Sequence, residues 1–115
     1  MDIISFREYC LAKPGTTEHF PFDDVTLVFK VGGKMYALCD VDQFTSVNLK
    51  CDPEKATELR EQYTGIIPGY HMNKKHWNTV DAQGSVPEKL FRKLIDESYL
   101  LVVSSLPKKD REKLA

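Results

Sequence analysis

The residues best suited to chemistry gather in one stretch, Pro68–Val80, which reads PGYHMNKKHWNTV. It holds two of the three histidines, the single tryptophan and two adjacent lysines, and no Asp or Glu occurs from Gln62 to Val80. Imidazole and amide groups can form hydrogen bonds, aromatic rings can stack on bases, and lysines can neutralise phosphates. Four interpretations therefore compete for this stretch: a metal site, a catalytic site, a nucleic-acid contact and a structural turn.

A metal site would have to start from His71 and His76, whose spacing of five residues occurs among zinc ligands. No cysteine pair and no nearby carboxylate completes the three or four ligands that zinc requires. A hard cation such as iron would need several oxygen ligands, and the first predicted helix offers only Asp2 and Glu8. We therefore expect neither a metal nor any other cofactor.

Cysteine catalysis finds little support in the sequence, because an active thiol needs an adjacent base. Cys10 and Cys39 fall on apolar faces, where cysteine behaves as a small hydrophobe. Cys51 precedes a predicted helix, whose dipole would lower the pKa of the thiol, yet no orienting partner is evident. The common hydrolase and nucleotide-binding motifs are absent, so we predict no enzymatic activity. An enzyme that uses His71 or His76 as acid or base would need an enclosed pocket.

Length, charge and cysteine usage narrow the class of protein. A chain of 115 residues that is 42% hydrophobic suits one domain, 1–115, with its own core. The net charge of −1 gives no overall attraction to nucleic acid, so such binding would need a local basic patch. Three cysteines without Cys-x-x-Cys spacing favour a reducing cytoplasm. No basic signal-peptide segment and no membrane-spanning apolar run is seen.

Hydrophobic periodicity predicts the elements that must position the stretch. An apolar stripe at helical spacing indicates a helix over Asp2–Ala12, which Pro14 ends. Thr16–Asp23 is expected to be a polar loop, and the charged tail after Pro107 a solvated, frayed end. Alternation, capping and turn signals predict the remaining elements: strands at Val25–Val31, Lys34–Val41, Phe44–Lys50 and His76–Val80, a tight turn at Gly32-Gly33, a helix over Asp52–Tyr63 with Asp52 as N-cap and Pro53 first, and a last helix from Val86-Pro87.

The predicted order is α-β-β-β-α-β-α, with short turns between the first three strands. This order favours an α+β two-layer sandwich with a mainly antiparallel sheet and helices on one face. Met35, Ala37 and Cys39 are expected on the same face of their strand. The other sheet face is expected to be polar and open to solvent, with Thr26, Lys30, Tyr36, Ser46, Asn48 and Lys50 on it.

Five segments resemble the MmcQ/YjbR family and cover nearly the whole chain in the expected order. They are TTEHFPF at Thr16–Phe22, GKMYAL at Gly33–Leu38, LKCDPE at Leu49–Glu54, the stretch Pro68–Val80, and LIDESYLLV at Leu94–Val102. The resemblance implies a compact α+β fold similar to CyaY, the bacterial frataxin, and DNA binding through a double-wing arrangement. It does not imply the iron chemistry of frataxin, because fold does not determine function.

We therefore predict a non-enzymatic DNA-binding protein whose contacts are mainly to phosphates, with weak sequence specificity. The predicted contacts are phosphate neutralisation by Lys74 and Lys75 with Lys30, Lys34 and Lys50, hydrogen bonding by His71, Asn73 and His76, and stacking by Tyr70 or Trp77. The alternative is a protein-interaction or small-ligand-binding module that uses the polar sheet face and the 68–80 loop. The sequence leaves open whether Trp77 is buried or exposed, and it leaves open the oligomeric state.

Overall fold

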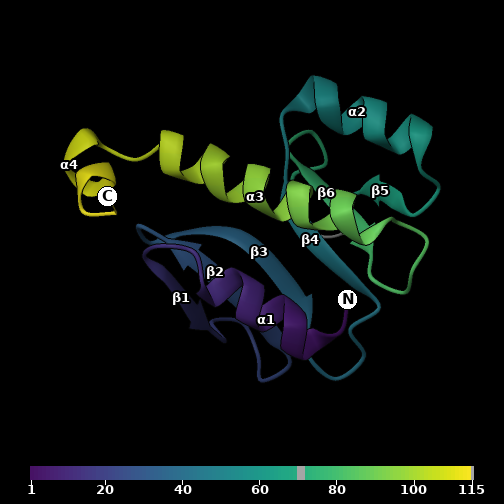
Figure 1. Ribbon diagram of the computed structural model, residues 1–115, viewed down its shortest axis with the longest axis horizontal. Helices are drawn as coiled ribbons and strands as arrows, with labels where there is room; N and C mark the ends of the chain where they lie inside the picture. The colour runs from purple at the N-terminus through teal and green to yellow at the C-terminus, as the bar shows by residue number, and fades with distance from the viewer. Residues whose placement is uncertain (70–71, 115) are drawn as a thin grey trace.

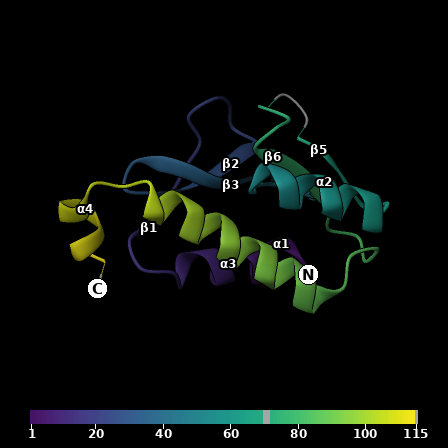
Figure 2. The same ribbon diagram turned by 90° about the horizontal axis from the view of Figure 1, so that it is seen from above.

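The chain forms an α+β two-layer sandwich in the computed structural model, which describes residues 1–69 and 72–114 (Figure 1). Its strands form one antiparallel sheet in the order β1-β2-β3-β4-β6-β5. Helices α1 and α3 cover one face of this sheet, and no helix of the described chain covers the opposite face (Figure 2). The elements are α1 (Ile3–Leu11), β1 (Thr16–His19), β2 (Thr26–Val31), β3 (Lys34–Asp40), β4 (Ser46–Lys50), α2 (Pro53–Gln62), β5 (Ile66–Pro68), β6 (Trp77–Asp81), α3 (Glu88–Ser104) and α4 (Lys108–Glu112).

The predicted architecture is confirmed, and so are its main local signals. Asp52 caps α2, where its Oδ2 accepts a hydrogen bond from the Lys55 backbone N–H at 3.4 Å, and Pro53 occupies the first turn. Gly32 and Gly33 form the β2–β3 turn with φ of 58° and 79°. A Cβ atom on Gly32 would also lie 2.6 Å from the side chain of Leu106, so packing excludes a larger residue there.

Three elements were not predicted. The expected loop at Thr16–Asp23 contains the edge strand β1, which pairs with β2 from Thr16↔Val31 to His19↔Val28. Strand β1 is not predicted by hydrophobic alternation, because an edge strand with half of its residues exposed needs few apolar residues. Strand β5 has only three residues, too few for a periodic signal. The expected frayed tail contains α4, and Leu114 beyond it contacts the core.

The third predicted strand begins later than expected. Phe44 was its predicted first residue, but β4 begins at Ser46. Phe44 has φ of 41°, a left-handed conformation that no strand residue adopts. Its ring lies 5.5 Å from that of Phe6, so contact with the core accompanies this unusual turn.

A β-bulge corrects the predicted faces of β3. The register runs Phe29↔Ala37 and then Lys30↔Met35, so Tyr36 is an extra residue and the alternation reverses there. Tyr36 is therefore fully buried in the core instead of lying on the open face, and its hydroxyl donates to the carbonyl of Cys10 at 3.2 Å. Met35, expected on the same face as Ala37, pairs instead with Lys30.

Ser98 of α3 fills the gap that opens between β3 and β4 beside the bulge. Its hydroxyl donates to the Tyr36 carbonyl and accepts the Lys50 backbone N–H at 2.9 Å. Ser98 is fully buried, so it supplies hydrogen bonds that the interrupted strand pairing cannot. The helix layer thereby holds the ends of the two central strands in place.

Phe6 links the two layers in the core. Its ring centroid lies 5.5 Å from those of Phe29 and Phe44 and 6.4 Å from that of Phe91. These partners come from β2, the β3–β4 connection and α3, so one side chain joins three parts of the fold.

Among the described residues, no helix has both the length and the apolar character that crossing a bilayer would require.

Candidate nucleic-acid interface

The sheet face opposite α1 and α3, called the open face below, consists of three rows of side chains. Residues paired in the register of adjacent strands point to the same side, so the pairing assigns each row. The lysine row contains Thr17, Lys30, Met35, Lys50 and Trp77. The middle row contains His19, Val28, Leu38, Asn48, Thr79 and Ile67. The aspartate row contains Thr26, Asp40, Ser46 and Asp81.

The open face is polar at both ends but not throughout. Lys30 and Lys50 lie at one end of the strands, and Asp40 and Asp81 lie at the other. Between them Val28 is 0% exposed and Leu38 is 7% exposed, although neither faces the helix layer. The expected polar surface is thus crossed by an apolar segment, and its positive and negative charges are separated along the strands.

Two loops rise from the open face and flank it (Figure 2). The first wing is residues 20–25, between β1 and β2, and the second wing is residues 69 and 72–76, between β5 and β6. The second wing closes through the Gly69 backbone N–H, which donates to the Trp77 carbonyl at 2.8 Å. Because the backbone N–H of Cys51 donates to the His76 carbonyl at 2.7 Å, this wing adjoins the Lys50 end of β4.

Asn73 organises the turn in the second wing. Its side-chain Oδ1 accepts the Lys75 backbone N–H at 2.9 Å, and its carbonyl accepts the N–H groups of His76 and Trp77 at 3.2 and 3.0 Å. These bonds shape the backbone on which Lys74 and Lys75 stand. The expected role of Asn73 as a ligand contact is therefore accompanied by a structural role that the sequence analysis did not predict.

Arg60 anchors the second wing to α2. Its Nε donates to Asn78 Oδ1 at 2.7 Å, and its Nη2 donates to the carbonyls of Trp77, at 3.3 Å, and Lys74. Arg60 was not predicted as a functional residue, because an arginine in the last turn of a helix is ordinarily explained by the helix dipole. Asn78 is 2% exposed, so the guanidinium satisfies an acceptor that would otherwise be buried without a partner.

Four of the lysines predicted to contact phosphate lie on the lysine row or on the second wing beside it. Lys74 and Lys75 are exposed on the second wing, and Lys30 and Lys50 are half-buried in the lysine row. In the described part of the chain none of these four ammonium groups takes part in an ion pair. Their charges are therefore available to an external anion.

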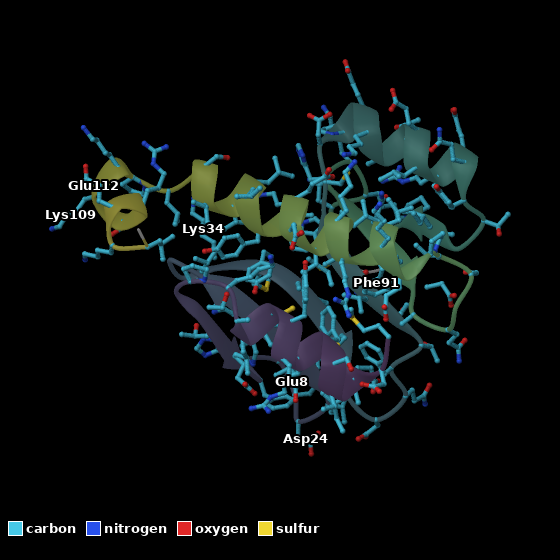
Figure 3. All side chains as sticks on the ribbon, viewed as in Figure 1. Glu8, Asp24, Lys34, Phe91, Lys109 and Glu112 are labelled. Atoms are coloured by element: carbon cyan, nitrogen blue, oxygen red, sulfur yellow. The ribbon has the colours of Figure 1, made fainter. Side chains whose placement is uncertain are left out.

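Lys34 lies apart from this group. Its register partner is Val31, a core residue, so Lys34 points to the helix side of the sheet. Its Nζ donates to Ser105 Oγ at 3.3 Å, and Figure 3 shows Lys34 beside the C-terminal end of α3. The β-bulge at Tyr36 reverses the alternation of β3, so Lys34 lies on the helix side and is not part of the candidate interface.

The predicted aromatic and imidazole contacts, Trp77 and His76, are less exposed to a ligand than Lys74 and Lys75. Trp77 is 8% exposed, because β6 holds its ring against the sheet, and so it does not offer a free face for stacking. His76 is half-buried beside it. Tyr70 and His71 lie outside the described residues. The candidate interface therefore consists of lysines, and Trp77 has no exposed ring to support its predicted stacking role.

The three cysteines are buried thiols. Desolvation by burial raises the pKa of Cys10 and of Cys39 to about 12. It also raises the pKa of Cys51, opposite to the direction expected from the helix dipole, because burial disfavours the charged thiolate more than the nearby Lys55 favours it. Among the described residues no three His, Cys, Asp or Glu side chains lie close enough to hold a metal ion.

We expect the free energy of unfolding to decrease as pH rises above 9. A thiol ionises near 9.0 in the unfolded chain but near 12 at Cys10 and Cys39 in the folded one, so the unfolded state releases protons first. Each thiol of this kind then contributes a loss of about 1.4 kcal/mol in total between pH 8 and pH 10, most of it above pH 9. Urea unfolding across this range measures the loss. The Cys39→Ala variant should lose the share of one thiol, and a flat profile would contradict the assignment.

An antiparallel sheet with helices on one face and two wings on the other defines the class of this protein: a two-layer α+β sandwich with one open, wing-flanked face. Within that class the chain belongs to the YjbR family, whose family model matches residues 11–101. The predicted family is thus confirmed.

Relatives share this fold over most of their length. The YjbR protein of Escherichia coli K12 is 36% identical over 115 residues, which cover 99% of this chain and 98% of that protein. YbdF of Escherichia coli O157:H7 is 42% identical over 96 residues, covering 83% of this chain and 79% of that protein. The crystal structure of DR2400 from Deinococcus radiodurans, described as a DUF419 domain, matches with a TM-score of 0.93 and 46% identity, covering 98% of this chain and 87% of that one.

Proposed function

We propose that the chain binds DNA without catalysis, mainly through phosphates, at the lysine end of the open face. One observation carries the proposal: Lys30 and Lys50 stand at one end of a sheet face that α1 and α3 leave uncovered, and the wing with Lys74 and Lys75 adjoins the Lys50 end of β4. Adjacent strands lie about 4.8 Å apart, so Lys30 and Lys50, two strands apart, are spaced by roughly 10 Å along this end. Contacts of this kind position a nucleic acid but read little sequence.

The cysteines support the non-catalytic part of the proposal. Their thiols are buried and protonated at neutral pH, so they are poor nucleophiles. Free thiols without disulfides also suit a reducing compartment, and we place the activity in the cytoplasm.

The proposal is tested by the salt dependence of binding. Fluorescence anisotropy with labelled DNA across a salt series should show affinity falling steeply as salt rises, because each phosphate contact releases counterions. Replacing both Lys74 and Lys75 by alanine should lower the slope of log K against log salt by about 1.4 to 1.8, the share of two phosphate contacts.

The matched control replaces Lys108 and Lys109, another adjacent pair of exposed lysines, by alanine. Both stand on α4, and Figure 3 shows Lys109 at one end of the long axis of the molecule. This control should leave the slope unchanged. An equal loss in both double variants would indicate a general charge effect and would reject the second wing as the contact, and absence of binding at low salt would reject DNA as the ligand.

The second candidate is a module that binds a protein or a polar small molecule on the same face. The observation that favours it is a hollow of about 320 Å³ on the open face, lined largely by hydroxyl and amide side chains. Binding of this kind would depend weakly on salt, because few ionic contacts are exchanged. The salt series therefore separates the two candidates.

A further inference from the structure

A trough crosses the open face beside the aspartate row. Two hollows, of about 320 and 510 Å³, share Thr45, Ser46 and Thr79 in their lining and therefore adjoin, and together they are called the trough below. The trough extends from Asp40 at the end of β3 to Ile67 on β5. It lies next to the lysine row because both are built on β4 and β6.

The lining of the trough differs from the lysine row in charge. Threonine, serine, asparagine and glutamine side chains supply most of it, together with the carboxylates of Asp40 and Asp81. The described residues that line it include no lysine or arginine. A phosphate is thus repelled from the trough and attracted to the lysine row, whereas uncharged groups with amine or hydroxyl donors find acceptors in the trough.

Both carboxylates are fixed in orientation by their own turns. Asp81 Oδ2 accepts the backbone N–H groups of Gln83 and Ser85 at 3.2 and 3.1 Å and the Ser85 hydroxyl at 2.6 Å, and these bonds hold the pKa of Asp81 below its usual value. Asp40 Oδ1 accepts the N–H groups of Asp42 and Gln43 at 2.8 and 3.1 Å. In each case the second carboxylate oxygen has no hydrogen-bond donor among the described residues, so it can accept one from a ligand.

We infer that the trough receives the unpaired bases and sugars of a single strand whose phosphates lie along the lysine row. The inference rests on the proposed function and names its substrate class. Cytosine, adenine and guanine carry exocyclic amino groups that donate to carboxylates, and thymine does not. In a duplex the bases are stacked inside the helix and only their edges are reached through the grooves, so the bases cannot enter the trough and only the lysines would bind.

Exposed apolar side chains on the first wing and in the trough lining add support. Phe20 and Phe22 of the first wing are 49% and 66% exposed, and Ile67 in the trough lining is 49% exposed. Flat rings offer stacking surfaces to bases of any sequence, which single strands present and duplexes hide. These phenylalanines replace Trp77 as the candidate stacking residues.

The test compares single-stranded and double-stranded DNA of equal length at one low salt concentration by fluorescence anisotropy. Wild type should bind the single strand about tenfold more tightly and should prefer oligo-dC to oligo-dT. Ser46→Tyr, which fills the trough where the two hollows meet, should weaken single-strand binding about tenfold and leave duplex binding within about twofold. The Asp40→Asn exchange removes a charge at an exposed position and hardly changes the shape of the side chain. It should reduce the preference for oligo-dC over oligo-dT.

The control is Ser104→Tyr, the same exchange at an exposed position on α3 in the helix layer, and it should change neither affinity. Thermal unfolding checks that Ser46→Tyr folds, and if it does not, Asp40→Asn carries the test. Equal affinity for the two forms of DNA, or equal binding of the two homopolymers, would overturn the trough assignment. The salt slope lost in the variant with both Lys74 and Lys75 replaced would then still support the proposed function, so the two failures are distinguishable.

Discussion

Replacing Phe6 by alanine is expected to lower the free energy of unfolding by about 3–5 kcal/mol. The ring is fully buried and contacts Phe29, Phe44 and Phe91, so its removal leaves a cavity between the sheet and both α1 and α3. The surrounding rings belong to different elements and cannot all move inward together. Urea denaturation monitored by circular dichroism measures the loss as a lower midpoint with an unchanged slope.

The matched control for this prediction lies on the same helix. Ile4 is 68% exposed, so Ile4→Ala removes an apolar side chain of α1 without opening a cavity. Its effect should stay within about 0.5 kcal/mol. If both variants lose the same stability, the cost comes from the helix as such and not from the aromatic cluster, and the description of Phe6 as the link between layers would be wrong.

Arg60→Ala is expected to lower the free energy of unfolding by about 2–3 kcal/mol, because it leaves the buried side-chain oxygen Oδ1 of Asn78 without a donor. It should also release the second wing, since the same guanidinium holds the Lys74 and Trp77 carbonyls. Urea denaturation measures the first effect. Hydrogen exchange measures the release of the wing. In the variant, the backbone amides of His76 and Trp77, which donate to the Asn73 carbonyl in the wild type, should exchange faster.

Arg111→Ala provides the comparison for Arg60→Ala. Arg111 is an exposed arginine of α4 whose guanidinium reaches only the Ser104 carbonyl, at 3.4 Å, in the described part of the chain. Its replacement should cost less than about 0.5 kcal/mol. A loss at Arg60 no larger than this would show that the hydrogen bonds from α2 do not stabilise the wing.

Much of the fold follows from signals that lie within a few neighbouring residues of the sequence. The Gly32-Gly33 turn needs positive φ at both positions, and Asp52-Pro53 begins a helix by capping, so both could be predicted from the sequence. The β-bulge at Tyr36 could not, because one inserted residue reverses the faces of a strand without leaving a trace in the hydrophobic pattern. The two edge strands also lack a hydrophobic pattern that would predict them, because β1 carries polar residues on an exposed side and β5 has only three residues.

The candidate site was predictable in composition but not in arrangement. The density of Lys74 and Lys75 in an acid-free stretch is visible in the sequence. Whether Lys34 shares a face with them depends on strand register, which only the folded sheet fixes. The anchor Arg60 is separated from Asn78 by 18 residues, and nothing local marks the pair. Long-range contacts therefore decide which predicted residues act together.

The separation of lysines from aspartates across the open face makes that face an electric dipole on a nearly neutral protein. With a net charge of −1 the molecule as a whole exerts no attraction on a distant polyanion. A dipole turns an approaching partner instead of drawing it in, and at physiological ionic strength its field decays within about 8 Å. The orientation of a ligand on the open face would thus be selected only at close range. Its association rate constant would be about 10⁵–10⁷ M⁻¹s⁻¹. Differences in affinity between ligands would then come from their dissociation rates.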